Sequence, residues 1–181
     1  RYLPELHRHG IPVLVVPVGS GNDFARSLGI RSRRIALAAW RRFCSDRGNI
    51  REIDLGVITA AQDEAGPQTF FCCVAGVGLD AGANARANRM PAWLRGTAGY
   101  LLAGVQELAS FEPVEFRLST DTGSLQRTGF LAAVGNARSY GGGMKVTPGA
   151  TLDDGLLDVC LVGEMSRVKV VFWLASICFG A

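Results

Sequence analysis

The sequence predicts an α/β segment over residues 1–46, followed by a β-rich domain with a helical insertion over residues 47–181. Three observations support this fold class. A short apolar run at residues 11–16 precedes a glycine-rich turn and two helical patterns, which is the order found in an α/β layer. Beyond about Gly48 the pattern changes to alternating segments that are typical of antiparallel strands. Apolar residues make up 48% of the chain and charged residues 19%, which provides a core and argues against disorder.

The first segment contains one expected strand and two expected helices. Residues 11–16, Ile-Pro-Val-Leu-Val-Val, lie between Gly10 and Pro17, and such a short apolar run predicts a buried, parallel strand. A helix is expected from about residue 24 to residue 28, where Gly29 ends it. A second helix is expected over residues 33–44, because apolar side chains recur there at helical spacing.

The second segment alternates most cleanly at residues 112–120, where Val114, Phe116 and Leu118 share one side of the expected strand. Its expected elements follow in order: a strand at 50–59, a hairpin loop at 61–67, a strand at 68–77, helices at 80–88 and 91–110, strands at 112–120 and 128–134 around a turn, a strand at 156–162, and a terminal helix from Ser166. Several antiparallel strands with helices inserted between them predict the β-rich domain.

Charge and cysteine content exclude several classes of protein. A net charge of +3 permits contact with phosphates or an anionic membrane surface but requires neither. No basic run is dense enough to indicate nucleic-acid binding, and the arginines within residues 31–42 predict the polar face of a helix. The five cysteines are odd in number and form no Cys-x-x-Cys motif, so they indicate reduced thiols in a cytoplasmic protein rather than disulfides or a zinc site.

The two ends of the sequence lead to a further expectation. The chain starts at Arg1 without a methionine and stops at Ala181 within an apolar helical pattern. We therefore expect residues beyond both ends. Residues 170–181 are apolar but too few to cross a bilayer, and they predict a buried helix.

The first candidate site is the glycine-rich loop that follows the expected strand at 11–16. It contains Gly19, Ser20, Gly21, Asn22 and Asp23. Glycines let the backbone approach a ligand closely, and amides at a helix start attract phosphate. Ser20 adds a hydroxyl donor, and Asn22 or Asp23 could hold a ribose or a phosphate-bound cation. The alternative is an ordinary strand-to-helix turn in which Asn22 or Asp23 caps the helix.

Three further loops carry unusual residues. Gly76 and Gly78 end an expected strand, and Asp80 is expected to cap the helix that follows. Three consecutive glycines at 141–143 are costly in chain entropy, so they indicate a loop that lies against a ligand or against the other segment. In the loop at 148–158, paired carboxylates beside a glycine indicate a site for a hard cation. The alternative for this last loop is a plain Asp-Gly turn.

Taken together and in this order, these loops resemble the catalytic domain of the diacylglycerol kinase family, and most closely the soluble bacterial lipid kinases related to sphingosine and ceramide kinases. The matching residues are 17–26 (Pro-Val-Gly-Ser-Gly-Asn-Asp-Phe-Ala-Arg), 78–81 (Gly-Leu-Asp-Ala), 136–143 and 153–158 (Asp-Asp-Gly-Leu-Leu-Asp). The resemblance covers nearly the whole chain. Its first and last motifs are fairly specific.

The resemblance implies a nucleotide-binding α/β domain, similar to those of phosphofructokinases and NAD kinases, followed by a β-sandwich, with ATP and a catalytic magnesium ion in the cleft between them. Ser20 falls where the family usually has a nucleotide-contacting threonine. The family's structural magnesium ligands fall on the Asp154 side chain and on the carbonyls of Thr151 and Leu156. One departure is Cys73, where the family often has asparagine.

The resemblance also implies what is missing and what the whole protein binds. The family's Gly-Gly-Asp-Gly-Thr loop is expected before Arg1, and its general base, a glutamate, beyond Ala181, so the chain alone is expected to be nearly inactive. The implied activity is transfer of the γ-phosphate of ATP to a lipid hydroxyl. The implied partners are a lipid substrate, a membrane surface that is contacted transiently from the cytoplasm, and, as an option, a second copy of the chain. The alternatives are a kinase for a non-lipid alcohol and a non-catalytic nucleotide- or membrane-binding module.

Overall fold

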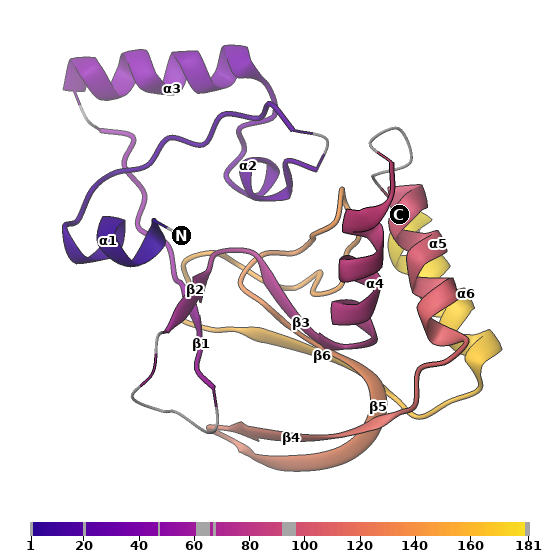
Figure 1. Cartoon of the computed structure of the whole chain (residues 1–181). Helices are drawn as coiled ribbons and strands as arrows, with labels where there is room; N and C mark the ends of the chain where they lie inside the picture. Colours follow the sequence, from indigo (N-terminus) through magenta and orange to yellow (C-terminus); the bar gives the residue numbers. More distant parts are fainter. Residues whose placement is uncertain are drawn as a thin grey trace.

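The structure, a computed structural model, describes residues 2–19, 21–46, 48–60, 66, 68–91 and 97–179. Its first part contains three helices joined by extended chain: α1 (Leu3–Arg8), α2 (Asp23–Ser27) and α3 (Arg33–Asp46). The two helices predicted at 24–28 and 33–44 are therefore confirmed as α2 and α3. In Figure 1 these helices lie together above the strands of the second part.

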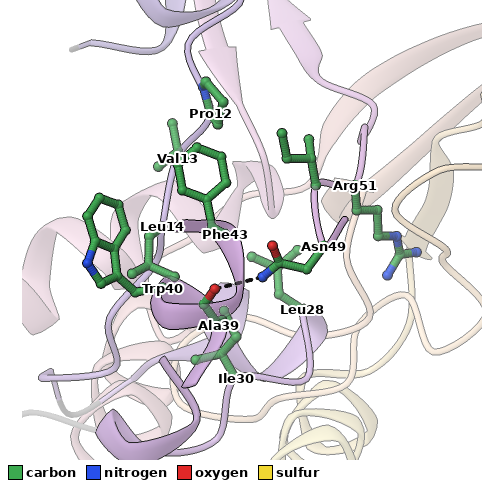
Figure 2. Close-up of a pocket in the computed structure, with 11 residues that line it drawn as sticks. Pro12, Val13, Leu14, Leu28, Ile30, Ala39, Trp40, Phe43, Asn49 and Arg51 are labelled. Atoms are coloured by element: carbon green, nitrogen blue, oxygen red, sulfur yellow. Dashed lines mark hydrogen bonds between the residues drawn. The ribbon is translucent and has the colours of Figure 1, made fainter. Parts of the chain in front are cut away.

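The apolar run at 11–16 is not a buried strand in this structure, so that prediction is wrong. The segment is extended, but Ile11, Val13, Leu14 and Val16 are between 37% and 57% exposed. A strand is defined by backbone hydrogen bonds to a neighbour. Among the described residues, no strand pairs with this run. Pro12, Val13 and Leu14 of this run instead border a pocket of about 300 Å³ that lies between them and α3 (Figure 2).

The predicted hairpin around residues 61–67 is confirmed in its pairing but is shorter than expected. β1 (Gly56–Ile58) pairs with β2 (Thr69–Phe71) in antiparallel fashion. Of the predicted loop at 61–67, the structure describes Gly66 alone. The single strand predicted at 68–77 is divided, because β2 pairs with β1 whereas β3 (Val74–Gly78) joins a different sheet. The break between them falls at Cys72 and Cys73.

A four-stranded antiparallel sheet is built around β5 (Gly123–Gly135), the longest strand. Its first half pairs with β4 (Val114–Thr120). Its second half pairs with β3 on one side and with β6 (Asp158–Gly163) on the other. The sheet thus confirms the strands predicted at 112–120, 128–134 and 156–162. Because Gly135 pairs with Val74 of β3 on one side and with Asp158 of β6 on the other, the loop that follows Gly135 starts beside the first residues of both strands.

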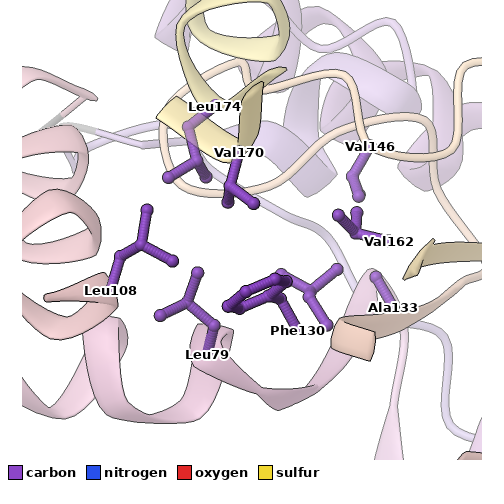
Figure 3. Packing of buried hydrophobic residues seen from close by; sticks show 9 residues of the cluster. Leu79, Leu108, Phe130, Ala133, Val146, Val162, Val170 and Leu174 are labelled. Carbon is purple, nitrogen blue, oxygen red and sulfur yellow. The ribbon is translucent and has the colours of Figure 1, made fainter. Parts of the chain in front are cut away.

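Three helices complete the second part: α4 (Leu79–Arg89), α5 (Thr97–Leu108) and α6 (Arg167–Phe179). They stand side by side against the sheet in Figure 1. Leu79, Phe130, Val162, Val170 and Leu174 meet in the core between helices and sheet (Figure 3). Burying such side chains is the main stabilising term for this half of the chain. In the described part of the chain, no helix is long and apolar enough to cross a membrane.

The prediction that Asp80 caps α4 is wrong: Gly78 occupies the N-cap position, and Asp80 lies buried in the first turn. Gly78 can precede the helix because its φ is +86°, a value that favours glycine, and a Cβ there would approach the Phe130 carbonyl oxygen to 2.6 Å. The domain boundary predicted between residues 46 and 47 stays a prediction.

Candidate functional site

The side chain of Asp23 joins the two parts of the chain. Asp23 begins α2 and is only 9% exposed. Its Oδ1 accepts hydrogen bonds from Arg26 Nη2 at 2.7 Å and from Ser139 Oγ at 3.0 Å. Its Oδ2 accepts a third from the Gly142 amide at 2.7 Å. The loop predicted to contact a nucleotide and the triple-glycine loop are therefore held at one place.

The turn just before Asp23 is closed by Asn22. The Gly19 amide donates to Asn22 Oδ1 at 3.0 Å, and Asn22 Nδ2 donates to the Gly19 carbonyl. Asn22 has a φ of 55°, in the left-handed region that asparagine tolerates better than most residues. It occupies the N-cap position of α2, but its side chain binds backward to Gly19 instead of capping the helix. Ser20 lies outside the described residues, so its contact with nucleotide stays a prediction.

The three consecutive glycines are explained by backbone conformation. Gly141, Gly142 and Gly143 have φ values of 61°, 98° and 118°. A side chain at any of these positions would be strained, and only glycine adopts such a run at low cost. A Cβ on Gly141 would also collide with the Met144 side chain, which is fully buried. Since the Gly142 amide binds Asp23, the prediction that this loop lies against the other part of the chain is confirmed.

A second link between distant segments forms around Gly155, within the loop predicted to hold a cation. The Gly155 amide donates to Asp54 Oδ2 at 2.8 Å, and the Asp54 amide donates to the Leu152 carbonyl at 2.7 Å. The Leu156 amide donates to Asp154 Oδ1 at 3.0 Å. Gly155 has a φ of +74°, so the turn requires glycine. Asp54 was not predicted as a site residue, although a carboxylate just before Gly56 in a strand-like segment was a visible signal.

The oxygen atoms around this loop are of the kinds that bind a magnesium ion. Magnesium is bound by oxygen ligands, often one or two carboxylates, with water completing the shell. Asp154 and Asp54 both lie at the turn, and each has one carboxylate oxygen that makes no hydrogen bond among the described residues. The carbonyls of Thr151 and Leu156 accept no backbone hydrogen bond within the described chain. No group of three or more acidic, histidine or cysteine side chains gathers in that part of the chain, so carbonyls would be needed.

Asp153 has a different role from its neighbour Asp154. Arg51 donates to it through two hydrogen bonds, Nε to Oδ2 at 2.8 Å and Nη2 to Oδ1 at 2.6 Å. This bidentate contact lowers the pKa of the Asp153 carboxyl below its usual range. Both carboxylate oxygens are thus used by Arg51. Of the two adjacent aspartates, Asp154 is the one left available for a cation.

Asn136 connects the loop after β5 to Asp54 and to the segment at Cys72 and Cys73. It is fully buried, and its Nδ2 donates to the Asp54 carbonyl at 2.7 Å and to the Cys72 carbonyl at 3.4 Å. Its amide and that of Ala137 both donate to the carbonyl of Cys73. At the Cys73 position, where the resembled family often has asparagine, polar contacts are therefore made by the backbone. Asn136 lies in a motif that carries the family resemblance, but its role could not be predicted from the sequence.

Asp80 belongs to a separate buried cluster. The Tyr140 hydroxyl donates to Asp80 Oδ1 at 2.5 Å, and the Tyr100 hydroxyl lies 3.2 Å from that of Tyr140. Burial raises the pKa of the Asp80 carboxyl, and the hydrogen bond from Tyr140 opposes this in part. Burial also raises the pKa of the Tyr140 phenol. Because Tyr140 precedes the three glycines, this cluster anchors one end of their loop.

Comparisons with known proteins agree with this arrangement. Residues 2–58 match the family described as the diacylglycerol kinase catalytic domain, and residues 73–181 match the family described as the YegS C-terminal NAD kinase beta sandwich-like domain. A diacylglycerol kinase from Mycobacterium tuberculosis is 40% identical over 172 residues, which cover 94% of this chain and 53% of that protein. A diacylglycerol kinase from Bacillus subtilis is 30% identical over 157 residues, covering 87% and 48%.

Solved structures support the fold. A crystal structure of a diacylglycerol kinase from Bacillus anthracis strain Sterne matches with a TM-score of 0.60 at 20% identity, over 91% of this chain and 49% of that one. The α/β-plus-β-sandwich fold class and the family resemblance stated from the sequence are confirmed by these matches. The chain spans about half the length of the curated relatives it matches.

Proposed function

This chain belongs to the diacylglycerol kinase family of lipid kinases, and from that membership we propose that the whole protein transfers the γ-phosphate of ATP to a lipid hydroxyl. The observation that carries the proposal is the pair of hydrogen bonds that Asp23 accepts from the Ser139 hydroxyl and the Gly142 amide. They bring the glycine-rich turn at 17–22 and the triple-glycine loop at 141–143 together, as a site for nucleotide phosphates requires. Phosphoryl transfer depends mainly on positioning and on stabilising phosphate charge, which backbone amides in such loops can supply.

In this proposal Gly19, Ser20, Gly21 and Asn22 contact the nucleotide. Asp23 was included with them in the sequence-based prediction. Its carboxylate already accepts three hydrogen bonds, so we now assign it to positioning the two loops rather than to binding ribose or phosphate. Asn22, bound back to Gly19, sets the shape of the turn. These roles can be separated, because a positioning residue affects stability as well as activity.

Magnesium is the second part of the proposal. The Asp154 side chain and the carbonyls of Thr151 and Leu156 would hold a structural ion, and Asp54 lies close enough in the same network to support it. When bound, the ion supplies a positive charge that relieves crowding among the carboxylates of this loop. The chain's own contribution is the turn at Gly155, which orients the oxygens. ATP-bound magnesium is implied by the family rather than by this loop.

The activity is tested with the whole protein, ATP and two acceptors: diacylglycerol in mixed micelles, and glycerol in solution. We expect phosphate to appear on diacylglycerol and not on glycerol. Phosphorylation of glycerol alone would support the alternative of a kinase for a non-lipid alcohol. ATP binding without transfer to either acceptor, or to a membrane lipid extract, would support a non-catalytic nucleotide-binding module.

A matched pair of variants connects the activity to the site. Asp23→Ala should lower activity at least tenfold, since the two loops lose their link. Glu5→Ala is the control, because Glu5 is exposed and, among the described residues, forms ion pairs with Arg8 and His9 alone. Equal activity of both variants would remove Asp23 from the site.

We also propose that the whole protein is cytoplasmic and contacts a membrane surface peripherally, because its acceptor is a lipid, and that it forms a homodimer. Vesicle sedimentation tests the membrane contact, and analytical ultracentrifugation tests the homodimer.

A further inference from the structure

A groove of about 710 Å³ between the two parts of the chain is lined by five basic side chains and, among the described residues, by no acidic one. The basic residues come from three separate regions: Arg26 and Arg31 from the α2 helix and the loop after it, Arg51 from the segment before β1, and Arg138 and Lys145 from the region after β5. We call this the basic groove. The residues that line it do not include the turn at 17–23, but they do include Ser139 and Gly143 of the loop after β5 and Thr151 of the loop proposed to hold magnesium.

Two of the five charges are already balanced. Arg26 pairs with Asp23 at 2.7 Å, and Arg51 pairs with Asp153 at 2.6 Å. Within the described part of the chain, Arg31, Arg138 and Lys145 make no ion pair. Three uncompensated positive charges therefore face one concave space. Like charges in such a space raise its potential and attract an anion.

Some of these side chains are also held in place. Arg138 Nε donates to the Ala150 carbonyl at 3.2 Å, which fixes the guanidinium and leaves its terminal nitrogens free of hydrogen bonds among the described residues. Arg26 is fixed by Asp23, and its Nη2 lies 3.9 Å from the position a Cβ would take on Gly143. Donors that are fixed before a ligand arrives lose less entropy on binding. On an ordinary solvated surface, arginine side chains are not expected to be held so that several of them line one groove.

We propose that the basic groove binds a phosphate group, either as a free anion or as the headgroup of an anionic phospholipid. Arg31, Arg138 and Lys145 make the charge-assisted contacts, and Arg26 and Arg51 contribute field while remaining in their ion pairs. Guanidinium groups suit this ligand, because their planar pair of N–H donors matches two phosphate oxygens. The groove shares Ser139 and Gly143 with the proposed nucleotide site, but its test is separate, since binding is measured without turnover and with that site filled by ADP.

The test uses the whole protein and two probes. In the first arm, inorganic phosphate and pyrophosphate are titrated by calorimetry in the presence of saturating ADP, so that the nucleotide site is filled. In the second arm, sedimentation is measured with vesicles of phosphatidylglycerol and of phosphatidylcholine. The double variant Arg31→Ala/Lys145→Ala should bind at least about tenfold more weakly in one arm or both. Loss in the first arm alone identifies a free phosphate ligand, and loss for phosphatidylglycerol vesicles identifies a lipid headgroup.

Controls separate a site from general charge. Arg42→Ala and Arg34→Ala together remove the same charge from exposed positions of α3 that do not line the groove. Equal weakening by this control pair, or unchanged binding of the groove variant in both arms, overturns the proposal. Arg31→Lys/Lys145→Arg keeps the charge and should retain most of the binding, which also shows that a loss does not come from misfolding. Binding should weaken as salt is raised, as expected for contacts between charges.

Discussion

The amide of Gly155 donates a hydrogen bond of 2.8 Å to the Asp54 carboxylate, joining residues 101 positions apart in the sequence. This contact closes the turn that presents Asp154, and Asn136 ties the same Asp54 to the loop after β5. One half-buried aspartate thus orders two of the loops that the sequence marked for chemistry. Four predictions test the contacts around these loops.

Asp54→Ala should lower the free energy of unfolding by about 2 kcal/mol, because the Gly155 amide loses a charged acceptor. Urea unfolding of the whole protein measures the change. Asp121→Ala is the control, since Asp121 is exposed in the turn between β4 and β5 and should change stability by no more than about 0.5 kcal/mol. A matching small effect for Asp54→Ala would mean that this contact does not order the turn.

Asp23→Ala should destabilise the protein by about 3 kcal/mol, since a buried carboxylate is removed and the Gly142 amide, Ser139 and Arg26 lose their acceptor. Asp23→Asn should cost less, because an amide oxygen still accepts from one donor. Thermal and urea unfolding give the ranking. If the asparagine variant loses as much stability as the alanine variant, the charge of Asp23 matters more than its hydrogen bonds.

Asp80 should make stability depend on pH. Its folded-state pKa is raised, chiefly by burial, above the unfolded value of about 3.9. A raised carboxyl pKa means that the folded state holds its proton more tightly, so this contribution is fully present below about pH 3.9 and is lost as pH rises through the folded pKa. Asp80→Asn should remove this dependence while still accepting from Tyr140. The measurement is the difference in unfolding free energy between variant and wild type from pH 3.5 to 8, and a flat difference would contradict the shift.

Asp154→Asn should remove most of the stabilisation that magnesium gives to the whole protein. A ligand present at 100 times its dissociation constant stabilises a folded protein by about 2.7 kcal/mol, and a variant that cannot bind it gains nothing. Melting temperatures with and without magnesium provide the measure, with Asp121→Asn as the matched control. An unchanged magnesium response would make Asp154 a turn residue whose carboxylate serves only the Leu156 amide.

Several helices, one strand pair and the family of this protein could be predicted from its sequence alone. Local patterns were sufficient for α2, α3 and α6 and for the antiparallel pair β4–β5, because periodicity and turn residues act over a few positions. The loop at 141–143 was expected to lie against a ligand or the other segment, and its Gly142 amide does bind Asp23. The positive φ of these three glycines and of Gly155 explains why glycine is needed there. The family could also be inferred from the order of the loops, and the comparisons confirmed it.

Other features were decided only by the tertiary structure. The run at 11–16 has the composition of a buried strand, yet burial and pairing depend on neighbours that a local pattern does not contain. Asp54 and Asn136 were missed because their importance lies in contacts across more than 60 positions. The basic groove likewise joins side chains from three segments that are unremarkable one by one. Hydrogen bonds and electrostatic fields act through space, so their partners become visible only when the chain is folded.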